Sequence, residues 1–175
     1  MTEYLLIPHD RIGVLIGPKG QTKKRIEKNT KTKIEIDSST GEIEITMKGN
    51  AIDFMKAIKI VKAIARGFSP ENAMLLLIDD NILEIIELRE IIGKNENKMK
   101  AKKGRVIGRK GKARKEIEQE SNVKISVYGK TISIIGKNED VEKAKKAIQL
   151  LLFGASHSTA YESLKNKYYN QEFEL

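Results

Sequence analysis

The sequence predicts an α+β protein made of two similar modules in tandem, each with the order β-α-α-β-β-α and a three-stranded sheet packed by three helices. Three observations lead to this fold class. A glycine-containing segment at residues 12–20 recurs at residues 103–111, two period-2 apolar stretches follow each copy, and a segment with an apolar helical face closes each copy. A length of 175 residues accommodates two modules of this size.

The repeat has a regular spacing. Gly17 aligns with Gly108, an offset of 108 − 17 = 91. The same offset aligns Lys24 with Lys115, Ile26 with Ile117, Lys33 with Lys124, and Ile34 with Ile125. Later glycines follow a shorter offset of 136 − 49 = 87, which aligns Gly49 with Gly136 and Gly67 with Gly154. The second copy therefore lacks 91 − 87 = 4 residues, and we place this deletion in a hairpin loop, residues 37–42 in the first copy and 128–131 in the second.

The repeat predicts a first domain at residues 1–68, a helical connector at 69–81, a second domain at 82–154, and a partly helical tail at 155–175. The elements expected in the first domain are a strand at 4–7, a short helix up to the glycine turn, a helix at 21–29, strands at 33–36 and 42–45, and a helix from the capping residue Asn50 to Gly67. Those expected in the second are a strand at 83–91, a short helix, a helix at 112–121, strands at 123–127 and 131–134, and a helix from the capping residue Asn138 to Gly154.

The connector and the closing helices have clear local signals. Ser69-Pro70-Glu71 combines an N-cap, a first-turn proline and an early acid, which predicts a helix at 70–78. Each closing helix has an apolar face, made of Phe54, Ile58, Val61 and Ala65 in the first copy and of Val141, Ala144, Ile148 and Leu151 in the second.

The charge distribution favours a polyanionic partner, either a nucleic acid or an anionic membrane surface. The net charge is +9, and residues 97–115 contain ten Lys and Arg residues without an acid, whereas residues 69–92 contain six acids and only Arg89 as a base. The chain has no cysteine and only two histidines, which are far apart, so we expect no metal or other cofactor. No stretch is apolar enough to span a membrane, and we expect a cytoplasmic protein.

The Gly-x-x-Gly turns carry the chemistry that we expect to bind nucleic acid. Glycine has no Cβ, so a phosphodiester approaches its backbone closely, and the next helix contributes N–H groups and the positive end of its dipole. The predicted contacts in and after the turns are Gly17, Pro18, Lys19, Gly20, Lys23 and Lys24 in the first copy, and Gly108, Arg109, Lys110, Gly111, Lys112, Arg114 and Lys115 in the second.

An Ile-Gly-x-x-Gly turn after an apolar strand, followed by a basic helix, resembles the signature of KH domains of the eukaryotic type, type I. The segments 104–114, 125–131 and 154–158 are more narrowly similar to the "partner of Nob" family of small-subunit ribosome assembly proteins. The turn at 17–20 is intact, as in the archaeal branch of that family. Ser156 stands where the family usually has proline.

The resemblance implies that the protein binds single-stranded RNA at the 3′ end of small-subunit ribosomal RNA, beside a PIN-type nuclease of the Nob family. It also adds Arg105, His157 and Ser158 to the expected RNA contacts.

Two other functions remain open on sequence grounds. The chain could recruit RNA to a degradation or transcription complex, which requires the same KH chemistry. It could also be a small nuclease in which Asp79 and Asp80 bind magnesium. We favour a protein without catalysis, because these two acids have no further clustered carboxylates, and because His157 lacks a Gly-x-Ser-x-Gly motif that would indicate a hydrolase.

Overall fold

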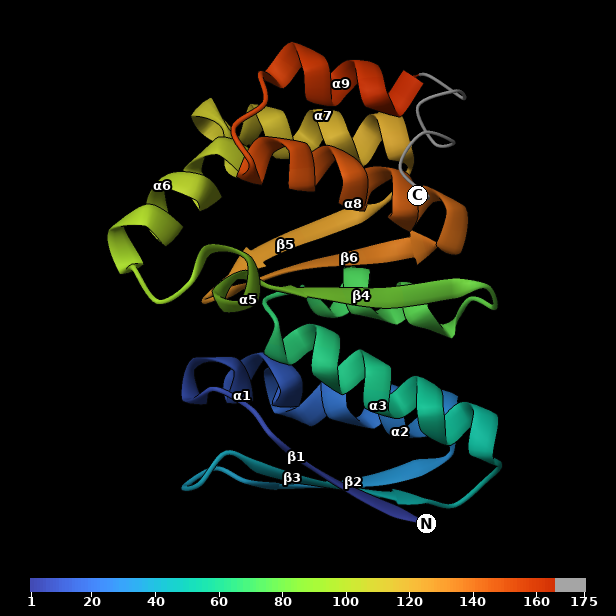
Figure 1. The fold of residues 1–175 in the computed structure, drawn as a ribbon. Coiled ribbons are helices and arrows are strands. Elements are labelled where there is room, and N and C mark those ends of the chain that lie inside the picture. The colour runs from blue at the N-terminus through green and yellow to red at the C-terminus, as the bar shows by residue number, and fades with distance from the viewer. Residues whose placement is uncertain (166–175) are drawn as a thin grey trace. The chain divides into compact units, whose positions relative to one another are not determined.

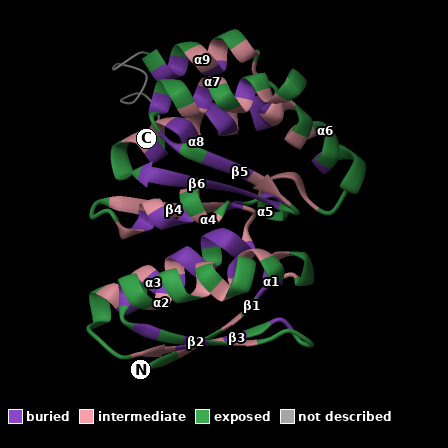
Figure 2. Ribbon diagram, turned by 180° about the vertical axis from the view of Figure 1, so that it is seen from behind, coloured by how far each residue is buried: buried purple, intermediate pink, exposed green. Residues whose placement is uncertain are grey.

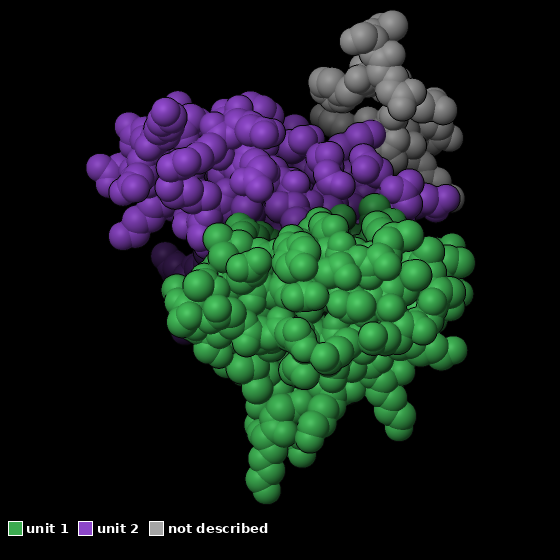
Figure 3. Space-filling model, turned by 90° about the horizontal axis from the view of Figure 1, so that it is seen from below, with its two compact units in different colours: residues 1–83 green, residues 84–175 purple. Residues whose placement is uncertain are grey.

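The computed structural model describes residues 1–165 and divides into two compact units, residues 1–83 and the residues from 84 onward (Figure 1, Figure 3). Unit 1 contains β1 (Thr2–Leu6), α1 (His9–Ile16), the 3-10 turn η1 (Pro18–Gly20), α2 (Gln21–Thr30), β2 (Thr32–Asp37), β3 (Glu42–Met47) and α3 (Ala51–Ala65). It continues with α4 (Pro70–Ala73) and the 3-10 helix η2 (Met74–Leu77), which occupy the segment predicted as a helical connector.

Unit 2 repeats the order from β1 to α3, with an additional short helix after its first strand and a further helix at its end. The next strand, β4 (Asn81–Glu87), crosses the boundary between the units. It is followed by α5 (Leu88–Ile92), α6 (Glu96–Ile107), η3 (Arg109–Gly111), α7 (Lys112–Ser121), β5 (Lys124–Tyr128), β6 (Thr131–Lys137), α8 (Asn138–Leu152) and α9 (His157–Lys165). The tail predicted at 155–175 thus contains α9, and its residues 166–175 lie outside the described part of the chain.

Each unit has a three-stranded sheet with its last strand in the middle, in the orders β1-β3-β2 and β4-β6-β5. Strand β3 pairs antiparallel with both β1 and β2, and β5 pairs antiparallel with β6. The sheets, the helices and the element order confirm the predicted fold class. Strands β2 and β5 are consequently edge strands, which leaves one side of each open to other groups.

The core of unit 1 follows from the alternation in its strands. Ile34, Ile43 and Ile45 are fully buried, while Glu35 and Glu42 lie on the opposite, exposed face of the sheet. Figure 2 colours the ribbon by burial, and α3 carries both buried and exposed residues along its length. Helices α1, α2 and α3 contribute further buried side chains: Leu15, Ile26, Phe54, Ile58, Val61 and Ala65. Each isoleucine that is buried rather than exposed stabilises the fold by about 1.5–3 kcal/mol.

Unit 2 has an equivalent core. Its fully buried side chains include Ile117 on α7, Ile132 and Ile134 on β6, and the predicted face of α8, which consists of Val141, Ala144, Ile148 and Leu151. The predicted apolar faces of both closing helices are therefore confirmed.

Two sequence predictions about element ends are wrong. The strand expected at 83–91 ends at Glu87, where the N–H of Leu88 bonds to the carbonyl of Lys130 and the chain turns into α5. Asn138 does not cap α8, because β6 runs through Lys137 and the helix begins at Asn138 itself. In unit 1 two residues, Lys48 and Gly49, separate the strand from the cap, so Asn50 does cap α3 and accepts a bond from the N–H of Asp53 at 2.9 Å.

Candidate nucleic-acid interface

The two Gly-x-x-Gly loops have the same backbone conformation. The first glycines, Gly17 and Gly108, have φ/ψ of 71°/174° and 73°/176°. The third residues, Lys19 and Lys110, have 53°/28° and 53°/29°, and the final glycines have 72°/16° and 74°/13°. Corresponding angles differ by at most 16 − 13 = 3°, although Pro18 in one loop is replaced by Arg109 in the other. The loop backbone is therefore independent of the residue at its second position.

The two glycines of each loop are needed for different reasons. A Cβ on Gly108 would lie 2.7 Å from the backbone nitrogen of Ala113, and one on Gly17 would lie 2.9 Å from that of Thr22. The first glycine thus lets the loop pack against its own helix. A Cβ on Gly20 would have no atom within 4 Å, and one on Gly111 would approach only the Arg114 guanidinium, at 3.9 Å. The second glycine leaves open space above the backbone.

The glycine N–H groups of the two loops make equivalent hydrogen bonds, but the first loop has one backbone N–H fewer than the second. The N–H groups of Gly17 and Gly20 bond to Gly13 O at 2.9 Å and Gly17 O at 3.1 Å. Those of the equivalent Gly108 and Gly111 bond to Gly104 O at 2.8 Å and Gly108 O at 3.2 Å. Because Pro18 has no N–H, the first loop has one donor fewer to offer to an anion than the second.

The predicted loop cations lie where the loop and the following helix meet solvent. Exposed side chains are those of Lys19 and Lys24 in unit 1, and of Arg109, Lys110, Lys112 and Lys115 in unit 2. Helices α2 and α7 begin directly after the loops and have no side-chain cap. Each loop therefore combines cations, an accessible backbone and a helix N-terminus at one place.

Lys23 and Arg114 are less available than the other predicted cations, because each is paired with a glutamate one turn later. Lys23 Nζ lies 3.2 Å from Glu27 Oε1, and Arg114 Nε lies 3.8 Å from Glu118 Oε1. The two glutamates also accept hydrogen bonds from backbone N–H groups of the edge strands. We did not predict a role for Glu27 and Glu118, although both pairs obey the offset of 91 and were detectable by it.

Arg105 bonds to backbone carbonyls that precede His157 in the chain, and His157 bonds to the backbone carbonyl of Arg105. The Arg105 guanidinium donates to the carbonyls of Leu151, at 2.6 Å, and Ala155. His157 Nε2 lies 2.9 Å from the carbonyl oxygen of Arg105, and the His157 ring contacts that of Tyr161 with 6.1 Å between centroids. These contacts join α6 to the end of α8 and to the start of α9.

Arg11 makes the equivalent contacts in unit 1. Its Nε donates to the carbonyl of Ile64 at 2.8 Å, and its Nη2 donates to that of Phe68 at 2.7 Å. The acceptors correspond across the repeat, since 151 − 64 and 155 − 68 both equal 87, but the arginines do not, because Arg105 aligns with Val14. Alignment of the repeat therefore failed to indicate this shared tether.

Ser158 is exposed at the first turn of α9. Its hydroxyl lies 3.0 Å from that of Ser156, which also lies 2.8 Å from the hydroxyl of Thr159. Ser156 further accepts from the N–H of Thr159 at 3.2 Å. Ser156 therefore occupies the capping position of α9, so a residue other than the family's usual proline starts this helix.

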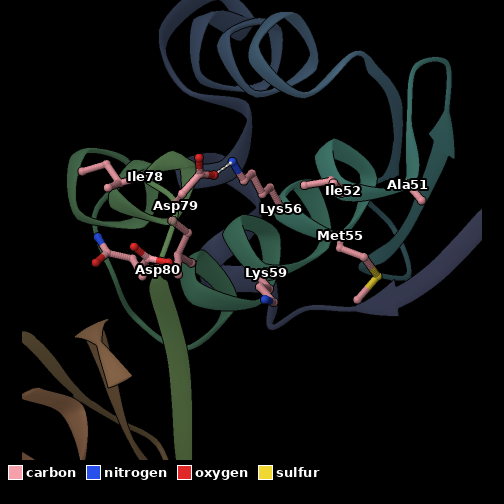
Figure 4. Close-up of a pocket in the computed structure, with 10 residues that line it drawn as sticks. Ala51, Ile52, Met55, Lys56, Lys59, Ile78, Asp79 and Asp80 are labelled. Carbon is pink, nitrogen blue, oxygen red and sulfur yellow. Dashed lines mark hydrogen bonds and ion pairs between the residues drawn. The ribbon is translucent and has the colours of Figure 1, made fainter. Parts of the chain in front are cut away.

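Asp79 and Asp80, the acids considered for magnesium, line a pocket between α3 and the connector, together with Ile52, Met55 and Lys56 (Figure 4). Lys56 Nζ lies 2.6 Å from Asp79 Oδ1 and donates to the carbonyl of Leu77 at 3.0 Å. The hydrogen bond from Lys56, followed by its charge, lowers the pKa of the exposed Asp79 carboxyl. Asp79 thus anchors the connector to α3.

Two absences within residues 1–165 bear on other functions. These residues contain no group of three or more His, Cys, Asp or Glu side chains placed to hold a metal ion. Over the same residues, no helix has the length and apolar character needed to cross a membrane.

Comparison with known families assigns both units. Residues 82–168 match the eukaryotic type KH-domain (KH-domain type I), and residues 2–63 match the KH domain. KH domain-containing protein MJ0443 of Methanocaldococcus jannaschii is 44% identical over 168 residues, which cover 94% of this chain and 73% of that protein. Pre-rRNA-processing protein PNO1 of Debaryomyces hansenii is 27% identical over 139 residues, 77% of this chain and 54% of its own length. The chain thus spans about half of this eukaryotic relative.

Solved structures of related proteins have the same fold over most of the chain. The crystal structure of Dim2p from Pyrococcus horikoshii OT3 has a TM-score of 0.89 and 50% sequence identity, covering 94% of this chain and 98% of that one. A structure of the a/eIF2alpha-aDim2p-rRNA complex from the same organism has a TM-score of 0.89 and 50% identity, with 94% and 92% of the chains covered. The resemblance to the "partner of Nob" family is confirmed. With two KH domains in tandem, the chain belongs to the KH-domain family, and its homologues are the PNO1 and archaeal Dim2p proteins.

Proposed function

We propose that the protein binds single-stranded RNA through its two Gly-x-x-Gly loops, at the 3′ end of small-subunit ribosomal RNA, during assembly and processing of that subunit. The observation that carries this proposal is the identical backbone of the two loops, each with open space above its second glycine and exposed cations beside it. A loop of this kind holds about four nucleotides of backbone.

The relatives support ribosomal RNA as the target. The Pyrococcus horikoshii Dim2p relative has been crystallised with rRNA and a/eIF2alpha, and the Debaryomyces hansenii relative is a pre-rRNA-processing protein. By extension, a PIN-type rRNA nuclease of the Nob family is the protein partner that we propose for the trimming step. The present chain supplies binding and no catalysis in this scheme.

We propose that unit 2 provides most of the affinity. Its loop contains two cations, Arg109 and Lys110, where the first loop contains only Lys19, and it retains the backbone N–H that Pro18 lacks. Lys112 and Lys115 extend the positive surface along α7, as Lys24 does along α2. More neutralised phosphates release more counterions, which strengthens binding.

Arg105 and His157 have supporting roles in this proposal, in place of the direct RNA contacts expected from the family resemblance. The Arg105 guanidinium donates to two carbonyls of its own unit, and His157 is bonded to the backbone of Arg105. They hold α6, which leads into the second loop, in place. The exposed Ser158 hydroxyl remains a proposed RNA contact.

Charge reversal in the loops tests the proposal. Arg109→Asp/Lys110→Asp should weaken binding of an rRNA 3′-end oligonucleotide far more than Lys19→Asp does. Each lost phosphate contact flattens the log–log salt dependence of single-strand binding by about 0.7, so the double variant should lose roughly 1.4 in slope. The measurement is a titration of each variant against one oligonucleotide at several salt concentrations.

A matched control separates loop contacts from net charge. Lys137→Asp/Lys165→Asp changes the charge of the molecule equally, at two exposed positions outside the loops. It should leave most of the affinity intact, and circular dichroism should show that all variants are folded. Wild-type affinity in Arg109→Asp/Lys110→Asp, or a larger loss in Lys19→Asp, contradicts the assignment of the main contact to the second loop.

A further inference from the structure

A three-part arrangement of side chains on the edge strands occurs in both units. Glu27 Oε1 accepts from the N–H of Ile34 on β2 at 2.7 Å, and Glu118 Oε2 accepts from the N–H of Ile125 on β5 at 3.1 Å. Each glutamate is also paired with the base four residues before it, Lys23 or Arg114. All three members obey the repeat offset, since 114 − 23, 118 − 27 and 125 − 34 each equal 91.

The glutamate changes what the strand edge offers to a ligand. Among residues 1–165, strand β5 pairs with β6 alone, so its outer edge presents backbone N–H donors and carbonyl acceptors. The N–H of Ile125 donates to Glu118 and is therefore not available to a ligand, and the Arg114 guanidinium lies 3.4 Å from the carbonyl of Ile125. A neutral backbone donor is thereby replaced by a negatively charged acceptor, which repels the carbonyl oxygens of a base and attracts its amino groups.

The carboxylate is fixed, and it lies close to the proposed phosphate site. Its side chain is only 15% exposed, and both oxygens have a partner, which leaves acceptor positions in a defined direction. Glu118 follows Gly111 by 118 − 111 = 7 residues on α7, a distance of about 10 Å at the helical rise of 1.5 Å per residue. A strand of about four nucleotides held at the loop reaches this position.

We propose that Glu118, and Glu27 in unit 1, are specificity-determining residues. Each accepts a hydrogen bond from the exocyclic amine of a base at the strand edge, and therefore selects a base that carries such an amine (cytosine, adenine or guanine) and rejects uracil, which has none. The inference rests on the proposed binding of single-stranded RNA by the loops. Carboxylates recognise the N4 amine of cytosine in the same way in nucleic-acid grooves.

A purely structural role for the glutamate makes a different prediction. Inward-pointing charged side chains also protect edge strands from pairing with other chains. If this were the whole role of Glu118, its replacement would alter stability or self-association but would leave base preference unchanged. Base preference is therefore the measurement that separates the two roles.

The experiment uses the full chain and a random-sequence pool of single-stranded RNA, from which bound molecules are recovered and sequenced. Wild type should exclude uracil about tenfold or more at one position of the bound register. Glu118→Gln retains the acceptor for Ile125, but its amide also donates to uracil O4, so the exclusion should fall to within about twofold. Glu120→Gln, an exposed change on the same helix, should keep the wild-type preference.

Glu27→Gln provides an independent test in unit 1. It should reduce the exclusion of uracil at a second position of the bound RNA, while the exclusion at the first position is unchanged. If wild type binds RNA but shows no position depleted in uracil, or if Glu118→Gln keeps the depletion, this inference is overturned and the proposed function stands. If wild type enriches no RNA at all, both are overturned. Arg109→Asp/Lys110→Asp should weaken binding of all RNA sequences alike. This result distinguishes loss of affinity for the RNA backbone from loss of base selection.

Discussion

The glycines of the two loops show how single residues determine the shape of the loops. The sequence motif predicted that all four were needed, and their positive φ angles agree with that expectation. It did not distinguish the first glycine of each loop from the second. That difference depends on the distance to the following helix, where Ala113 or Thr22 blocks a side chain at the first glycine only.

We expect Gly108→Ala and Gly111→Ala to separate stability from binding. The first change forces a Cβ against the Ala113 backbone and should destabilise unit 2 by about 1–3 kcal/mol beyond the strain of a positive φ. The second change has space and incurs only that strain, about 1–2 kcal/mol, but it fills the approach to the backbone. Thermal melting by circular dichroism and titration with an rRNA oligonucleotide measure the two effects. Equal melting temperatures in the two variants would contradict this division of roles.

The tethering arginines, Arg11 and Arg105, could not be identified from the sequence for a physical reason. Arg105 bonds to carbonyls 46 and 50 residues later in the chain, so its partners are determined by tertiary packing. The family resemblance suggested that Arg105 contacts RNA, and neither a motif nor charge patterning reveals which cations are already hydrogen-bonded inside the fold.

The repeat and the apolar periodicity predicted every strand and helix of the KH core. The residues at which these strands and helices begin and end were less predictable. The run Leu83-Glu84-Ile85-Ile86-Glu87-Leu88 continues in the sequence as Arg89-Glu90-Ile91-Ile92, which fits a strand or a helix equally well. The bond from Leu88 N–H to Lys130 O, which belongs to the β5–β6 turn, accompanies the change from strand to helix. A window of local sequence contains no information about that contact.

Asn50 and Asn138 form a matched pair for testing capping. Asn50 accepts from the N–H of Asp53 and donates to its carboxylate at 2.8 Å, so Asn50→Ala should destabilise the first turn of α3 by about 1 kcal/mol. Asn138 lies inside α8 without such a bond to the helix start, and Asn138→Ala should be nearly neutral. Hydrogen exchange of peptides from both helices measures the effects. Equal acceleration in α3 and α8 would show that the two asparagines are equivalent after all.

For the whole molecule, composition indicated an anionic partner, and the repeat indicated two binding modules. The net charge of +9 alone attracts any polyanion and does not distinguish RNA from an anionic membrane surface. The shape of the loops and the open edge strands beside them favour unpaired RNA, because a backbone clamp and an exposed base edge are both needed.

The protein should therefore prefer a single strand to a duplex. A segment from the 3′ end of small-subunit rRNA should bind more tightly than the same segment annealed to its complement, since the bases of the duplex are already paired. Competition gel shifts at one salt concentration measure the preference, and a scrambled strand of equal length reports the part due to charge alone. Equal competition by the duplex would leave the strand edges without a role in recognition.

The two tethering arginines reach equivalent carbonyls from positions that are not equivalent. The acceptors correspond in the two units, whereas the arginines stand 14 − 11 = 3 positions apart along the aligned helices, close to one turn. Because i and i+3 share a helix face, a long side chain placed at either position serves the same anchor. The same pair of carbonyls is therefore anchored from two different helix positions, so a residue-by-residue superposition of the two units does not reveal the shared donor.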